Sequence, residues 1–277
     1  ASLSTGFKSG HIQDSGNEAK PEAVVNYELG LKSTWLGGRL RMNAALYQAN
    51  YKDLQFSNRD RFDTDGDGVA DSSGSTIVRN AAGATMNGME FELEWALSDL
   101  DYLQMTLALV DAEFDDFQVP DTLFGDLFNP YVSGGEGNSL DAVDLSGNSP
   151  VITPDWKLTF VYERDILFAE GVLTPRFKAT FSDDYFLDIY NRTDIEPGVF
   201  PGVPKGGKNL SVQEAYSTFD LSLHYAPHTG AWSVEAFVNN VADQTIKTSS
   251  GTFLTEKGMS AIYTPPRIAG VSLSYTY

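Results

Sequence analysis

The stretch from Asp63 to Gly74, DTDGDGVADSSG, spaces its acidic residues like a calcium-binding loop. Ca²⁺ binds oxygen ligands, and a short loop supplies them through alternating carboxylates and a glycine at the turn. The candidate ligands are the carboxylates of Asp63, Asp65, Asp67 and Asp71 and the carbonyl of Val69. The last position, a bidentate Glu in an EF-hand, is Gly74, and strand-like segments flank the loop. The sequence therefore predicts either a smaller Ca²⁺ loop or an acidic turn without metal, and it requires no cofactor.

The three histidines raise the question of an enzyme. His224 and His228 lie beside a short turn, and His11 is alone in a loop. None of them has a partner that the sequence places to activate a nucleophile, and no Ser or Cys nucleophile motif is present. We therefore expect a protein that is not an enzyme.

Composition narrows the class of partner. The 277 residues carry a formal charge of -19, so a basic stripe for nucleic acid is missing and nucleic acid is excluded as a partner. No stretch approaches the roughly 18 to 20 apolar residues of a membrane-spanning helix. The first residues, ASLSTGFKSG, show no signal-peptide pattern and begin inside a strand, as in a chain that was processed or cut from a longer one.

Apolar and polar residues alternate with a period of two along most of the chain, which predicts strands with one apolar and one polar face. In the closing GVSLSYTY, for example, Val271, Leu273, Tyr275 and Tyr277 share one side. We predict ten strands, at residues 1–9, 22–36, 39–57, 77–97, 102–117, 155–164, 172–187, 216–226, 231–240 and 264–277. The fold class is all-β.

The connections between these strands alternate between short and long. Short links such as Gly37–Gly38 and 97–101 all fall at one end of the strands, and long links such as 58–76 and 118–154 at the other. This arrangement is typical of an antiparallel up-and-down transmembrane β-barrel in an outer membrane, whose apolar face meets lipid. A soluble half-buried sheet explains the alternation but not the sorting of the loops. Closure of such a barrel requires the last strand to pair with the first.

Aromatic residues gather near the short-turn end, where we expect half of a membrane-interface girdle. They are Trp35, Trp95, Tyr102, Tyr162, Tyr225, Trp232, Tyr275 and Tyr277. Glu90, Glu92 and Glu94 share one face of a strand whose neighbour carries Arg39 and Arg41. We expect cross-strand ion pairs in a wet lumen there, with a contact to substrate or to a plug as the alternative.

Five ordered stretches resemble the C-terminal barrel portion of TonB-dependent outer-membrane receptors. They are NYELGLKSTWLGGRLRMNAALYQANYKDLQF (26–56), NAAGATMNGMEFELEWAL (80–97), DLSGNSPVITPDWKLTF (144–160), FVNNVADQT (237–245) and PPRIAGVSLSYTY (265–277), and STGFKSG (4–10) resembles the part that precedes them. The family commonly ends in Phe where this chain has Tyr277. Family members form barrels of about 22 strands around a plug domain. This chain, with about ten strands over residues 1–277, resembles the C-terminal part without the plug.

The resemblance implies a multi-pass barrel in the outer membrane of a Gram-negative bacterium, surrounded by lipid. It further implies uptake of a scarce nutrient, a ferric siderophore first, with cobalamin or a glycan as other possibilities, and coupling to TonB through the missing plug region. The alternatives are a small self-closing barrel that acts as a passive pore or adhesin, and a soluble calcium-binding β-protein. In the family, loops and the upper lumen capture the ligand. The matching candidates are Phe124, Phe128 and Tyr131 in one loop and Tyr185, Tyr190 and Arg192 in another, although aromatics near 185–190 also suit an outer girdle.

Overall fold

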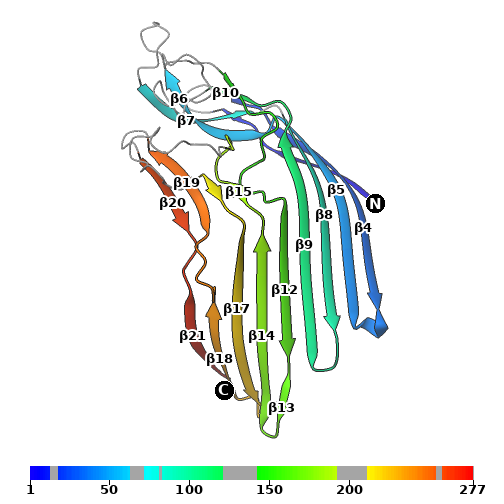
Figure 1. Cartoon of the computed structure of the whole chain (residues 1–277). Helices are drawn as coiled ribbons and strands as arrows, with labels where there is room; N and C mark the ends of the chain where they lie inside the picture. The colour runs from blue at the N-terminus through cyan, green and yellow to red at the C-terminus, as the bar shows by residue number, and fades with distance from the viewer. Residues whose placement is uncertain are drawn as a thin grey trace.

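The protein is one large antiparallel sheet with small hairpins at one end (Figure 1). The structure, a computed structural model, describes residues 1–12, 18–62, 72–80, 83–120, 142–191, 211–253 and 258–276. In spatial order the main strands are β1 (Ser2–Lys8), β4 (Glu22–Trp35), β5 (Leu40–Lys52), β8 (Gly83–Ala96), β9 (Asp101–Phe114), β12 (Trp156–Arg164), β14 (Gly171–Ser182), β17 (Tyr216–Pro227), β18 (Trp232–Asn239) and β21 (Ile268–Tyr275). This order follows the chain, so the predicted up-and-down meander is confirmed.

Short turns join alternate strand pairs at one end of the sheet. The turn between β4 and β5 is the 3₁₀ segment η1 (Leu36–Gly38), in which Gly37 and Gly38 have φ values of 65° and 97°. These left-handed conformations favour glycine, because it has no Cβ to clash with the backbone. The link between β12 and β14 carries the short strand β13 (Ile166–Phe168), which pairs with β14.

The long links lie at the opposite end and form two-stranded hairpins (Figure 1). These are β2 (His11–Ile12) with β3 (Glu18–Ala19), β6 (Gln55–Phe62) with β7 (Ser72–Asn80), β10 (Gln118–Pro120) with β11 (Ala142–Asp144), β15 (Tyr185–Phe186) with β16 (Val212–Gln213), and β19 (Lys247–Phe253) with β20 (Gly258–Tyr263). The predicted sorting of short and long connections is therefore confirmed. We call these two ends the short-turn end and the loop end.

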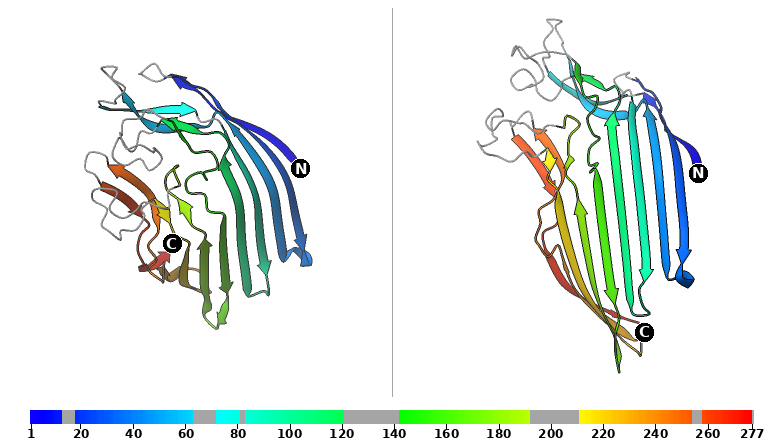
Figure 2. Two further views of the ribbon diagram at one scale, coloured as in Figure 1. Left: turned by 45° about the horizontal axis from the view of Figure 1, so that its top comes forward. Right: turned by 45° about the vertical axis from the view of Figure 1, so that its right-hand side comes forward.

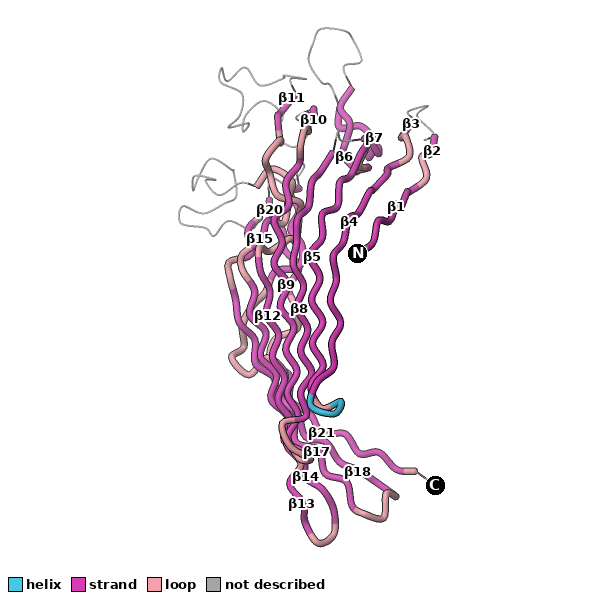
Figure 3. The backbone as a smooth tube through the Cα atoms, turned by 90° about the vertical axis from the view of Figure 1, so that its right-hand side faces the viewer, coloured by secondary structure: helices cyan, strands magenta, loops and turns pink. Residues whose placement is uncertain are grey.

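Three predicted strands each divide into two observed strands, one in the main sheet and one in a hairpin beyond it (Figure 3). The chain leaves the sheet at Asp53, which has a φ of 52°, so the predicted strand 39–57 becomes β5 and β6. The predicted strands 77–97 and 172–187 likewise divide into β7 and β8 and into β14 and β15. Strand-like residues stand on both sides of each bend, so a pattern of residue types did not mark where one strand ends and the next begins.

The pairing register gives the sheet one polar and one apolar face, because residues directly opposite each other share a face. The polar face carries, in neighbouring strands, Arg41, Asn43, Glu92, Glu94, Thr106, Thr159, Lys178, Thr180 and Asp220. The apolar face carries Leu31, Phe91, Leu107, Phe160, Phe177, Leu221 and Leu273. Leu31 is 65% and Leu273 72% exposed, so this face is not the inside of a core.

The apolar face extends over a limited height of the sheet. Phe160, Phe177, Phe219 and Phe181 form a continuous row of ring contacts on it, with centroid distances of 6.0 to 6.3 Å. Toward the loop end the same face becomes polar, where the side chain of Gln48 donates to Asn87 at 2.9 Å and Asp111 lies opposite Asn87. The apolar surface is thus a band with a polar margin at the loop end.

The sheet is curved and open in the described part of the chain (Figure 2). β1 pairs with β4 alone and β21 with β18 alone, so the expected pairing of the last strand with the first is wrong for this chain. The physical reason is curvature, because the diameter of a barrel grows with its strand number and ten strands at this curvature cover part of a circumference. Within the described ranges, the structure contains no helix with the length and apolar character that a membrane crossing requires.

Candidate functional site

The polar face near the short-turn end is lined by cross-strand polar pairs. Arg41 Nη1 donates to Glu94 Oε2 at 2.8 Å, and Asn43 Nδ2 donates to Glu92 Oε2 at 3.1 Å. Both pairs are direct partners in the register of β5 and β8. The predicted ion pairing is therefore observed for Arg41, whereas Arg39 donates to the carbonyl of Ala96.

The same pairing continues across the other half of the polar face. Arg176 Nε lies 2.8 Å from Glu163 Oε1, and Lys178 Nζ lies 3.6 Å from Asp220 Oδ2. These residues are also direct cross-strand partners. Such half-exposed pairs set the register and keep the face hydrated, and each stabilises the fold by about 1 kcal/mol or less. A hydrated polar wall of this kind suits a water-filled lumen.

Two aromatic rings lie flat over glycines on the polar face. A Cβ on Gly88 would lie 2.2 Å from Tyr47 Cζ, and one on Gly270 would lie 2.6 Å from Phe237 Cζ. Each glycine is the direct cross-strand partner of its ring. The absence of a side chain therefore lets each ring cover the neighbouring backbone.

The loop end of the polar face is closed by a small apolar cluster. Phe114 and Phe117 form an edge contact with a centroid distance of 4.6 Å, and Phe56 makes a similar contact with Phe117 at 4.9 Å. Ala84, Leu145 and Tyr190 complete the buried group. Residues from three different connections thus meet the loop ends of β8 and β9.

Hydrogen bonds join the segment after β11 to the segment after β15. The amide of Ser149 donates to Asn191 Oδ1 at 2.6 Å, and Asn191 Nδ2 donates to the carbonyl of Ser149 at 3.0 Å. Asn148 Nδ2 also donates to the carbonyl of Ile189 at 3.0 Å. The stretch DLSGNSPVITPD therefore connects two neighbouring loops. In it, the side-chain amides of asparagines form hydrogen bonds with backbone groups that have no partner in a neighbouring strand.

Two of the predicted ligand-binding residues are buried in these loop contacts. Tyr185 is 7% exposed, and its hydroxyl donates to the carbonyl of Lys247 at 2.8 Å. Tyr190 is 3% exposed and packs in the cluster around Phe117. Both residues have a structural role, which the sequence analysis did not assign, and their ligand-binding role stays a prediction.

The other predicted ligand residues lie outside the described residues. They are Arg192, Phe124, Phe128 and Tyr131. The candidate calcium ligands Asp63, Asp65, Asp67, Val69 and Asp71 also lie outside the described residues. In the part of the chain that the structure does describe, no group of three or more acidic or histidine side chains is placed to hold a metal ion.

Two carboxyl groups at the loop end have shifted pKa values. Burial raises the pKa of Asp184, and the negative charges of Asp183 and Asp155 raise it further. The Ser146 hydroxyl and then the Ser146 amide donate to the Asp144 carboxylate, at 2.6 and 2.9 Å, and lower its pKa. The loop end is therefore acidic in its described parts as well.

The aromatic residues of the short-turn end divide between the two faces. The register places Trp35, Trp95, Tyr162, Tyr225, Trp232 and Tyr275 on the apolar face. Tyr102 lies on the polar face, opposite Ala96 and Glu163, so its assignment to a lipid-facing row is wrong. Its neighbour Leu103 takes the apolar position, because successive residues of a strand point to opposite faces. Tyr277 lies outside the described residues.

An aromatic residue that was not predicted as part of a membrane-interface girdle lies at the opposite margin of the apolar band. Trp156 is 37% exposed and is paired with Leu109, just before the face turns polar at Asp111. The period of two predicts that Trp156 lies on this face, because it alternates in register with Leu158, Phe160 and Tyr162.

The three histidines are not gathered into one site. His224 lies opposite Thr174 and Glu235 on the polar face, and His11 pairs with Ala19 in a hairpin. The ring of His228 forms a hydrogen bond of 3.2 Å with the carbonyl of Phe168. Each histidine thus belongs to a separate structural contact.

An antiparallel meander with an exposed apolar band, a polar inner wall and long links at one end defines the wall of an outer-membrane type of β-barrel. A family model described as "TonB dependent receptor-like, beta-barrel" matches residues 1–241. The chain belongs to this family.

Solved structures of similar fold include receptors for ferric yersiniabactin, ferric preacinetobactin and pyoverdine. The ferric yersiniabactin uptake receptor FyuA from Yersinia pestis superimposes with a TM-score of 0.66 at 17% identity, over 98% of this chain and 33% of that one. The ferric preacinetobactin receptor BauA from Acinetobacter baumannii gives 0.61 at 13% identity, over 99% and 33%. The receptor FpvA from Pseudomonas aeruginosa bound to pyoverdine gives 0.59 at 19% identity, over 99% and 33%. The chain thus spans about one third of the length of these structures.

Proposed function

We propose that this chain is the C-terminal part of the barrel of an outer-membrane receptor for TonB-dependent uptake of a scarce nutrient, with a ferric siderophore as the first candidate ligand. The observation that carries the proposal is the family match over residues 1–241. The two-faced sheet supports it, because an exposed apolar band suits lipid and a polar wall suits a hydrated lumen. The structural neighbours named above are receptors for ferric yersiniabactin, ferric preacinetobactin and pyoverdine, and this supports the choice of ligand class.

In this mechanism the chain supplies the wall and part of the ligand-capturing loops. The loops would bind the ligand, and a plug domain supplied by the full-length receptor would move when TonB pulls it. The braced loop segments around Asn191 and Tyr185 would hold the loops at a fixed height above the wall. The proposal assigns no enzymatic reaction to the chain.

The alternatives are not favoured. A soluble calcium-binding β-protein would have to leave the apolar face, with residues as exposed as Leu31 and Leu273, in water. A small self-closing pore or adhesin would require β1 and β21 to pair, and in the described part of the chain they do not.

Uptake assays on cells test the proposed function. Iron-55 would be supplied on a panel of siderophores to iron-starved cells with and without the full-length gene. We expect one siderophore to be taken up with the gene and TonB both present, and to be bound without uptake in cells that lack TonB. If cells with and without the gene, and with and without TonB, bind and take up each siderophore equally, the proposal is contradicted for the siderophores of the panel. Cobalamin and glycans would then be tested in the same way.

A further inference from the structure

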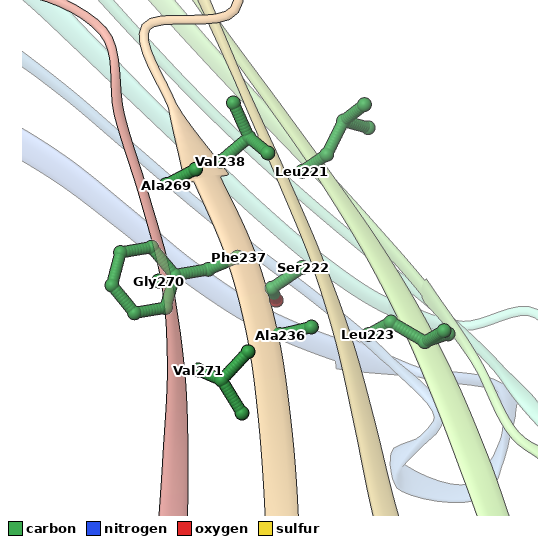
Figure 4. Close-up of a pocket in the computed structure, with 9 residues that line it drawn as sticks. All are labelled: Leu221, Ser222, Leu223, Ala236, Phe237, Val238, Ala269, Gly270 and Val271. Atoms are coloured by element: carbon green, nitrogen blue, oxygen red, sulfur yellow. The ribbon is translucent and has the colours of Figure 1, made fainter.

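A shallow groove of about 590 Å³ crosses the apolar face over β17, β18 and β21 (Figure 4). Its walls and floor come from two rows of direct cross-strand partners: Leu223, Ala236 and Val271 in one, and Leu221, Val238 and Ala269 in the other. The small side chains of Ala236 and Ala269 leave the space, and Leu223 and Val271 stand on either side of Ala236. The groove is therefore shallow and lined mainly by apolar side chains, which suits contact with hydrocarbon.

A positively charged residue, Arg267, lies at the loop end of this groove. Arg267 directly precedes β21, two residues before Ala269, and is exposed. Its amide donates to Asp243 Oδ1 at 2.8 Å, and Nη1 donates to the carbonyl of Val241 at 3.2 Å. These two bonds hold the residue in place but use only one of its five guanidinium N–H groups. No salt bridge joins Arg267 to a carboxylate within the described ranges, so its charge is available to an anion.

We propose that this groove binds one acyl chain of a phosphorylated membrane lipid, with the lipid phosphate at Arg267. The inference rests on the outer-membrane location proposed above. Val271 is four positions after Arg267, about 13 Å along a strand, so a phosphate at Arg267 places the start of an acyl chain over Ala269 and Ala236. Arginine recognises phosphate through several N–H groups at once, and a groove in a lipid-facing surface is filled by hydrocarbon.

Lipid binding to the full-length receptor tests the proposal. The receptor would be purified in mild detergent, stripped of bound lipid and titrated with dioleoyl phosphatidic acid or with dioleoylglycerol, which has the same chains without the phosphate. Native mass spectrometry counts the bound lipids. We expect phosphatidic acid to bind about tenfold more tightly, because a charge-assisted contact is added.

Two sets of variants locate the site, one at the cation and one in the groove. Arg267→Gln is expected to reduce binding of phosphatidic acid to that of dioleoylglycerol, whereas Arg267→Lys, which keeps the charge, and Lys52→Gln, which removes an exposed loop-end cation elsewhere, keep the preference. Ala236→Leu fills the groove and is expected to weaken both lipids. Ala44→Leu, on the apolar face between Leu31 and Phe91, is its matched control and is expected to change neither.

Equal binding of both lipids by wild type, or equal effects of Arg267→Gln and Lys52→Gln, would overturn the proposal. So would a receptor dimer that Ala236→Leu dissociates, since a second copy would then occupy the groove. Membrane fractionation separates this test from that of the function. If the receptor is absent from the outer membrane, the proposed location is contradicted. If the receptor is in the outer membrane but shows no preference for phosphatidic acid, only the proposed lipid site is contradicted.

Discussion

Asn191 and Ser149 bind each other through a reciprocal pair of hydrogen bonds, 2.6 and 3.0 Å long, between the amide side chain of Asn191 and the backbone of Ser149. Asn191 has a φ of 49°, a conformation that asparagine tolerates better than most residues. The pair joins segments that are 42 residues apart in the chain. It connects two loops at the end of the sheet where ligand capture is proposed.

Replacement of Asn191 by Ala is expected to loosen this loop junction by about 1–3 kcal/mol, because a partly buried backbone pair loses its partner and a strained φ is kept. Hydrogen exchange of the Ser149 amide in the full-length receptor measures the effect. Asn148→Ala, which removes a single bond to Ile189, is the milder comparison. Unchanged protection of Ser149 in Asn191→Ala would show that the junction does not depend on these bonds.

Alanine at Gly88 is expected to destabilise the barrel by about 1–3 kcal/mol, because its Cβ would overlap the ring of Tyr47. Gly30→Ala is the matched control on the same polar face, since a Cβ there would have its nearest neighbour at 3.7 Å. Thermal unfolding of the full-length receptor would compare them. Adding Tyr47→Ala to Gly88→Ala should reverse part of the loss. Equal stability of the Gly88 and Gly30 variants would contradict the packing argument.

Loss of the Arg41–Glu94 ion pair is expected to cost about 1 kcal/mol or less. The two side chains are 57% and 40% exposed, so water and salt screen their attraction. A double-mutant cycle with Arg41→Ala and Glu94→Ala, measured by urea unfolding in low and high salt, gives the coupling energy. A coupling energy of several kcal/mol that does not change with salt would contradict this expectation, because it would require both side chains to be shielded from water.

The turn at Asp144 is expected to weaken at acidic pH. The pKa of Asp144 is lowered in the folded state, so its stabilising contribution is present above the unfolded pKa and is lost as the pH falls through the folded pKa. Ser146→Ala removes the hydroxyl donor and should move this loss to higher pH, whereas Ser149→Ala should not. Exchange of the Ser146 amide against pH measures the midpoint. Identical midpoints in all three proteins would contradict the role of the hydroxyl.

The calcium loop remains a prediction from sequence. If Asp65 and Asp67 bind Ca²⁺, calorimetric titration of the chelator-treated full-length receptor should show binding that Asp65→Asn with Asp67→Asn abolishes. Asp99→Asn, in the short turn before β9, is the control for loss of acidic charge and should leave binding unchanged. If the heat of Ca²⁺ binding is equal in wild type and in the double variant, the loop does not bind Ca²⁺ through Asp65 and Asp67, and the interpretation as an acidic turn without metal is supported.

Sequence alone determined the ten main strands of the sheet to within a few residues at most ends, together with their order and their two faces. A period of two is a local property, so Val271, Leu273 and Tyr275 could be assigned to one face without knowledge of any partner. Loop lengths are also written in the chain, and they were enough to place every short turn at one end. The ion pair of Arg41 with Glu94 followed from the same alternation once the two strands were taken as neighbours.

Only the tertiary structure decided which residues meet across long distances and which edges pair. Tyr185 and Tyr190 stay predicted ligand-binding aromatics, and the structure adds that residues from other loops bury them. Burial depends on contacts that no local pattern records. Tyr102 lies at the same end of the sheet as the other aromatic residues but on the opposite face. A shift of one position along a strand moves a side chain from one face to the other. The open edges at β1 and β21 depend on curvature, which is a sum over all ten strands and not a property of any one of them.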